Sequence, residues 1–105
     1  MSFDDFRRSI AADALPAAQL TLAVHALWHD ARGDWEGAHA TVQGDEQNRE
    51  GAWVHAYLHR KEGDLGNAGY WYARAGRPMP KQDVTLDAEW ESIARALIGA
   101  SGERT

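Results

Sequence analysis

The 105-residue chain contains no cysteine, which removes one class of chemistry from consideration. Without thiols it has no disulfide framework, no thiolate zinc site and no cysteine nucleophile. Basic residues are also scarce, because 11 Lys and Arg stand against 16 Asp and Glu and give a formal net charge of −5. A protein that binds nucleic acid shows a basic surface instead. The composition therefore argues against a nucleic-acid partner.

The chain also lacks a long hydrophobic run. The longest stretch without a charged residue, Ala14 to Trp28, is interrupted by polar residues and is too short to span a bilayer. The acidic start has no basic segment before an apolar one, so we expect no signal peptide. We expect a single domain over residues 1–100 that is cytoplasmic and makes no membrane contact, with residues 101–105 as a frayed tail.

Apolar residues recur at intervals of three and four nearly everywhere, and no alternating run competes with this spacing. The pattern predicts an all-α fold of about six helices. Proline suits the first position of a helix, so the second helix is expected to begin at Pro16. A short helix precedes it, and the others are expected over residues 16–32, 35–43, 51–62, 65–75 and from residue 86 onward.

The sequence repeats itself at an offset of 30 residues, since residues 24–38 align with residues 54–68. Seven of the fifteen aligned pairs are identical: Val24/Val54, His25/His55, Ala26/Ala56, His29/His59, Gly33/Gly63, Asp34/Asp64 and Ala38/Ala68. The Gly-Asp pair has a mechanical reason, because glycine adopts the left-handed conformation that ends one helix and aspartate caps the next. The chain is therefore expected to contain two helical hairpins of one design.

The second hairpin carries a recognisable pattern of small and aromatic residues. The positions concerned are Ala56, Gly63, Asp64, Leu65, Ala68, Tyr72, Ala75 and Pro80. In this pattern residues 52–80 resemble a tetratricopeptide-type repeat, and residues 22–45 resemble a poorer copy. The offset of 30 is shorter than the usual period of about 34, so the resemblance is to a tetratricopeptide-like repeat. The segment around Trp53 also resembles a group of short microbial proteins without an assigned activity.

The resemblance implies two tetratricopeptide-like hairpins, capping helices at both ends, and a concave surface that binds a protein, a peptide or a second copy of the chain. Carried over by position, that surface includes Leu27, Asp30, Trp53, Tyr57 and Arg60. Tryptophan, tyrosine and arginine are the residue types favoured at binding hot spots. The alternative is that these aromatic side chains pack beneath the first or the last helix, because an aromatic stripe at helical spacing is often core.

The duplicated His-Ala-x-x-His motif suggests a metal site. Two histidines at i and i+4 share one face of a helix, so His25 and His29 form one pair and His55 and His59 form another. If the two helices are neighbours, the four imidazoles could converge on one divalent transition metal (Zn²⁺, Ni²⁺ or Cu²⁺), with His39 as a further ligand. Asp30 or Glu62 could replace a ligand or support one.

The alternative for these histidines is a pair of neutral, hydrogen-bonded core side chains that were duplicated together with the hairpin. The chain has no Gly-x-Gly-x-x-Gly, phosphate-loop or Gly-x-Ser-x-Gly motif, and Ala26 and Ala56 stand where a zinc protease places its glutamate. Enzymatic activity is therefore not indicated. Three hypotheses follow from the sequence: a protein-interaction module, a histidine-rich metal-binding protein and, third, a protein that binds a small ligand in an aromatic pocket.

Overall fold

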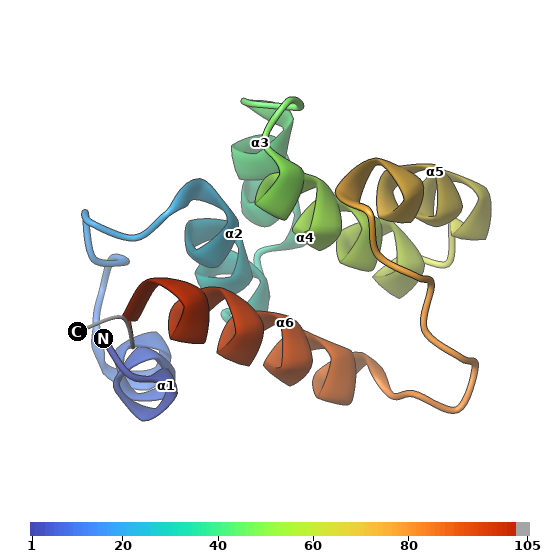
Figure 1. The fold of residues 1–105 in the computed structure, drawn as a ribbon. Helices are drawn as coiled ribbons and strands as arrows, with labels where there is room; N and C mark the ends of the chain where they lie inside the picture. Colours follow the sequence, from blue (N-terminus) through green and yellow to red (C-terminus); the bar gives the residue numbers. More distant parts are fainter. Residues whose placement is uncertain (103–105) are drawn as a thin grey trace.

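The computed structural model describes residues 1–102, with side chains described for residues 1–99. All regular structure in this range is helical, which confirms the predicted all-α fold (Figure 1). The helices are α1 (Phe3–Ala12), α2 (Leu22–Ala31), α3 (Trp35–Gln43), α4 (Arg49–Lys61), α5 (Leu65–Ala75) and α6 (Leu86–Gly102). None of the helices in the described part of the chain has both the length and the apolar character that a bilayer span requires.

The helix boundaries follow the caps. Helices α3 and α5 have the predicted bounds, but α2 begins at Leu22 and not at Pro16. The reason is Thr21, whose hydroxyl accepts a hydrogen bond from the backbone N–H of Val24 and so fixes the first turn there. In the same way the side chain of Asn48 caps α4, which begins at Arg49.

The predicted tail starts too early, because α6 continues through residues 101 and 102. The rest of that tail, residues 103–105, lies outside the described residues.

The two Gly-Asp turns have matching geometry, as the repeat predicts. Gly33 and Gly63 adopt positive φ values of 81° and 87°. The next residue in each turn, Asp34 or Asp64, donates its backbone N–H to a carbonyl at the end of the preceding helix over 2.9 Å. Each aspartate side chain then caps the following helix. Helices α2 and α3 therefore form one hairpin, and α4 and α5 form a second.

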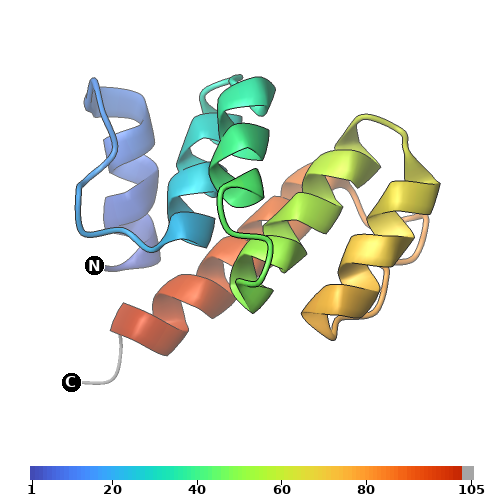
Figure 2. The ribbon, with the colours of Figure 1, turned by 90° about the horizontal axis from the view of Figure 1, so that it is seen from above.

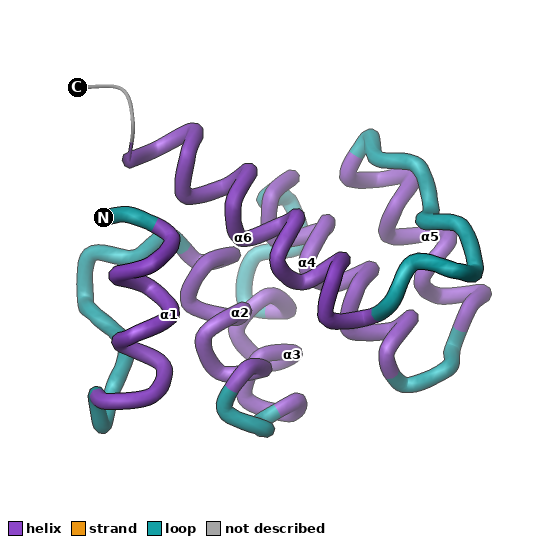
Figure 3. Tube along the Cα trace, turned by 90° about the horizontal axis from the view of Figure 1, so that it is seen from below, coloured by secondary structure: helices purple, strands orange, loops and turns teal. Residues whose placement is uncertain are grey.

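Helix α6 runs diagonally across one side of the molecule, over α2 and α4, and its C-terminal end lies beside α1 (Figures 2 and 3). The indole of Trp90 donates a hydrogen bond of 3.1 Å to the backbone carbonyl of Leu27 in α2. One turn farther along, Ile93 and Ala94 are buried in the apolar core, and Leu97 is buried there after a second turn. The last helix is thus part of the core and covers the face that the two hairpins share.

Two more indole N–H groups join neighbouring helices. Trp28 of α2 donates to the hydroxyl of Ser9 in α1 over 3.2 Å. Trp35 of α3 donates to the backbone carbonyl of Leu58 in α4 over 2.9 Å. Leu58 lies in the last turn of α4, and its carbonyl also accepts a hydrogen bond of 3.2 Å from the backbone N–H of Glu62, the residue that caps this helix. The Trp35 contact joins the two hairpins and holds the start of α3 against the last turn of α4.

Candidate metal centre

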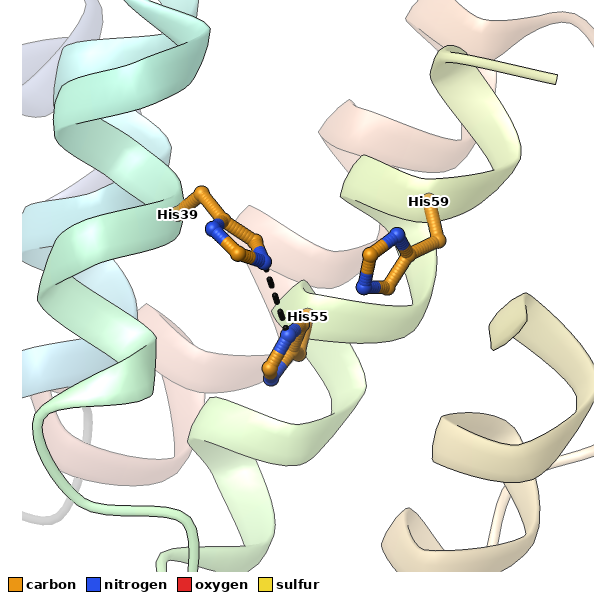
Figure 4. Close-up of side chains that lie close together, drawn as sticks. All are labelled: His39, His55 and His59. Carbon is orange, nitrogen blue, oxygen red and sulfur yellow. Dashed lines mark hydrogen bonds between the residues drawn. The ribbon is translucent and has the colours of Figure 1, made fainter. Parts of the chain in front are cut away.

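Three histidines gather where the two hairpins meet. His39 extends from α3, while His55 and His59 extend from successive turns of α4, and the three rings point toward one another (Figure 4). Their centroids form a nearly equilateral triangle with sides of 4.8, 5.0 and 5.2 Å. Each ring has a nitrogen within 4.8 Å of a nitrogen on both of the others. This arrangement brings three good ligands for a transition metal into one small volume.

The shortest contact in the cluster joins the Nε2 atoms of His39 and His55, which are 3.1 Å apart. Two nitrogens bound to one tetrahedral zinc at about 2.0–2.1 Å each lie about 3.3 Å from each other. The same separation suits an N–H···N hydrogen bond between two neutral imidazoles. The pair can therefore share a proton, or both nitrogens can bind one metal ion with little movement.

Two tryptophans flank the three imidazoles. Trp35 stacks on His39 with centroids 4.8 Å apart, and Trp71 of α5 stacks on His55 at 3.9 Å. His55 and His59 are buried, whereas His39 is partly exposed. The aromatic neighbours hold His39 and His55 in place, and the partial exposure of His39 provides a route from solvent to the cluster.

The surroundings of His39 and His55 favour the neutral form of both rings, which is the form that binds a metal. Burial, followed by the proximity of His39 and His59, lowers the pKa of His55 to about 4. Burial is also the main cause that lowers the pKa of His39, and neighbouring His59 contributes in the same direction. A metal ion binds the neutral imidazole, so a lowered pKa removes proton competition near neutral pH.

The three histidines differ in their outer partners. His59 Nδ1 lies 2.6 Å from the carboxylate Oε1 of Glu62, so Nε2 is the nitrogen that faces the cluster. His55 Nδ1, in contrast, is buried and has no hydrogen-bond partner among the described residues. Glu62 therefore contacts His59 from outside the cluster, a position consistent with one of the two roles suggested by the sequence. The other residue considered for those roles, Asp30, does not belong to this cluster, because Tyr57 and Lys61 bind its carboxylate.

The four histidines of the duplicated motif do not form one cluster. His25 and His29 stack on each other on α2 with centroids 5.2 Å apart, and within the described residues neither belongs to a group of three or more possible ligands. Equivalent side chains of two stacked hairpins face the same direction. His55 and His59 of α4 therefore face the first hairpin, where they meet His39 of α3. The expected four-histidine convergence is therefore wrong, and the further ligand His39 takes the place of the first pair.

The structure also corrects the predicted binding surface. Leu27, Asp30, Trp53 and Tyr57 are buried, and only 13% of the Arg60 side chain is exposed. These residues lie in the core or in ion pairs, and small surface pockets reach them, one at Asp30 and Tyr57 and another at Trp53. Helix α6 covers the face through Trp90 and through Glu89, which binds Arg60 over 2.8 Å. The alternative expectation, packing beneath the last helix, is the one that the structure supports.

Sequence reasoning missed the two tryptophans that flank the cluster. Trp35 precedes His39 by four residues, so one turn of α3 brings the two rings together, and this i, i+4 spacing was available as a signal. The stacking of Trp71 on His55 depends on how α5 packs against α4, which the spacing along one helix does not give.

Comparison with known proteins finds no matching family model and no significant match to a curated protein or a solved structure. The functional argument therefore depends on the residues of this chain.

Proposed function

We propose that this chain is a metal-binding protein that holds a divalent transition metal through His39, His55 and His59. The observation that carries the proposal is the 3.1 Å approach of His39 Nε2 to His55 Nε2 inside a triangle of three imidazoles. Buried polar nitrogens are normally paired with a complementary group, and three close imidazoles cannot all satisfy one another when each ring carries a single N–H. A metal ion would use one lone pair from each ring.

The donor set favours Zn²⁺, Ni²⁺ or Cu²⁺, because neutral imidazole is a preferred ligand of all three and the chain has no thiolate to offer. Three protein ligands leave a fourth position for water or another small ligand. We further propose that the scaffold is tetratricopeptide-like, an interpretation supported by the two Gly-Asp turns with the same hydrogen bonds. In this arrangement the metal joins α3 of the first hairpin to α4 of the second.

The tryptophans beside the two histidine groups provide a test that locates the metal. A paramagnetic ion such as Cu²⁺ quenches nearby indole fluorescence. Trp35 and Trp71 stack on ligands of the proposed site, whereas Trp28 contacts His29 with centroids 5.5 Å apart. We expect one equivalent of Cu²⁺ to quench the wild-type chain, with a smaller loss of signal in Trp35→Phe and Trp71→Phe. Trp28→Phe is the matched control and should lose as much signal as the wild type.

The histidine variants complete this test. His39→Ala and His55→Ala should each abolish quenching at micromolar Cu²⁺, and His25→Ala should not. Because His55 is buried, the partly exposed His39 provides the variant that is less disruptive to folding, and circular dichroism verifies that both are helical. The proposal is refuted if the wild type shows no quenching. It is also refuted if His25→Ala removes the effect while His39→Ala retains it.

Protein or peptide binding, or self-association, is the second proposed function. It is favoured by the fact that the face predicted for binding already accommodates a helix, α6. A partner would have to displace that helix and break the Arg60–Glu89 ion pair. Hydrogen exchange tests this idea, because it requires the amides of α6 to exchange faster than those of the central helix α4. Equal protection of both helices would contradict it.

A further inference from the structure

We propose that Glu62 is a positioning residue, which holds His59 in the tautomer that presents Nε2 to the metal. This inference rests on the proposed metal site. Glu62 is the residue that follows α4, and its carboxylate oxygen Oε1 lies 2.6 Å from His59 Nδ1. A carboxylate accepts hydrogen bonds, so Nδ1 carries the proton and donates it to Glu62. In the neutral form of the ring, which is the form that binds a metal, Nδ1 then carries the single N–H and the lone pair on Nε2 faces His39 and His55.

The other two histidines have no such support among the described residues. The Nδ1 atom of His55 has no hydrogen-bond partner, and the only hydrogen bond described for the ring of His39 is the one between the Nε2 atoms of His39 and His55. That shared contact needs a proton on one Nε2, and a metal ion needs both nitrogens free. His55 and His39 must therefore rearrange their protons when the metal binds. His59 alone is set in advance, and it is Glu62 that sets it.

The first repeat provides an internal comparison. The residue equivalent to Glu62 at the offset of 30 is Arg32, which donates a hydrogen bond to the backbone carbonyl of Ile10 and stacks over Trp28. The carboxylate described near His29 is that of Asp34, which lies 3.8 Å from Nδ1 and so beyond hydrogen-bond distance. His55 and His59, the pair that meets a third imidazole, are thus also the pair with a carboxylate, that of Glu62, at hydrogen-bond distance. The two features coincide as they would in a metal site.

Removing a side chain that hydrogen-bonds to a metal ligand typically lowers metal affinity by about 10- to 100-fold. We therefore expect Glu62→Ala to weaken Co²⁺ binding, measured by its visible absorption, by about that factor. Glu62→Gln retains an oxygen that accepts the hydrogen bond and should lose less. Glu50→Ala removes an exposed carboxylate from the first turn of α4 and serves as the matched control, with wild-type affinity.

Two spectroscopic measurements separate positioning from other roles. Nitrogen-15 NMR of the metal-free wild type should show the proton of His59 on Nδ1, and in Glu62→Ala it should move toward Nε2, the tautomer that a neutral histidine side chain prefers in water. The Co²⁺ absorption bands of Glu62→Ala at saturation should keep their wild-type shape, because Glu62 does not touch the metal. A changed coordination number would make Glu62 a ligand and overturn the positioning role.

The outcomes also distinguish this inference from the proposed function. If the wild type binds Co²⁺ and Glu62→Ala binds it within twofold, the positioning role is wrong and the metal site stands. A proton on Nε2 of His59 in the wild type likewise overturns the positioning role. If the wild type does not bind Co²⁺, the metal site is wrong, and this inference is wrong with it.

Discussion

Replacing Glu89 with alanine tests whether α6 closes the face of the two hairpins. The Glu89 carboxylate is 5% exposed and accepts a hydrogen bond of 2.8 Å from Arg60 Nη1. Its second oxygen accepts a hydrogen bond from the hydroxyl of Tyr72. Burial and this hydrogen bond both raise the pKa of Tyr72 above its ordinary value, so the hydroxyl keeps the proton that it donates. Glu89→Ala therefore leaves a largely buried guanidinium and a buried hydroxyl without their acceptor.

The expected loss of stability is large. Removing one partner of a buried ion pair costs about 3–5 kcal/mol, because the charge that is left behind has lost its compensation. For a domain of this size that corresponds to a fall in melting temperature of about 12–40 °C. Denaturant unfolding followed by circular dichroism measures the difference. Arg60 also donates to the backbone carbonyl of Val84, so part of its hydrogen bonding survives and the lower end of the range is expected.

Glu91→Ala is the matched control on the same helix. Its ion pair with Arg95 is exposed on both sides, with 44% and 58% of the two side chains accessible. Exposed pairs contribute about 0–1 kcal/mol, so this variant should unfold nearly as the wild type does. If Glu89→Ala destabilises the protein no more than Glu91→Ala, then α6 does not dock as described and the predicted groove is open.

Three further predictions concern stability. Zn²⁺ at a free concentration 100 times its dissociation constant should increase the free energy of unfolding by about 2.7 kcal/mol and raise the melting temperature by about 10–20 °C. An unchanged melting temperature of the wild-type protein would contradict the site. The pKa values of His39 and His55 in the folded protein lie below the unfolded value of about 6.5, so their contribution to stability is complete above pH 6.5 and is lost as the pH drops toward 4. For His55 the free energy of unfolding should fall by roughly 1.4 kcal/mol per pH unit over this range. A free energy of unfolding that does not change between these pH values would show that the rings are solvated. Trp53→Ala should cost about 3–5 kcal/mol in denaturant unfolding because its side chain is 91% buried beneath Arg77, whereas a loss below 1 kcal/mol would place it on the surface.

The all-α fold could be predicted because helix periodicity and capping are local properties. The turns at Gly33 and Gly63 required only a glycine and a following aspartate, and both have the expected geometry. The start of α2 is harder to place, because Pro16 predicts a start five residues before Thr21, whose side chain caps the helix in the structure. Helix periodicity and capping residues therefore predicted the helices, and the prediction was wrong at the start of α2.

The candidate site was predictable only in part, because it depends on how one hairpin faces the next. The i, i+4 spacing correctly placed His55 and His59 on one face of a helix. Which third imidazole they meet is decided by the packing of α3 against α4, and this brings in His39 and excludes His25 and His29. In the same way, the burial of Trp53 depends on the path of the last helix, which no local pattern reveals.

The most direct test of the metal site is X-ray absorption at the zinc edge of the full chain loaded with one equivalent of Zn²⁺. The account predicts three imidazole nitrogens at about 2.0–2.1 Å, with a fourth light ligand at a similar distance. His39→Ala should lose one imidazole from this shell, and the His25→Ala spectrum should equal that of the wild type. A shell without imidazole, or one that loses an imidazole in His25→Ala and not in His39→Ala, would contradict the metal centre proposed for His39, His55 and His59.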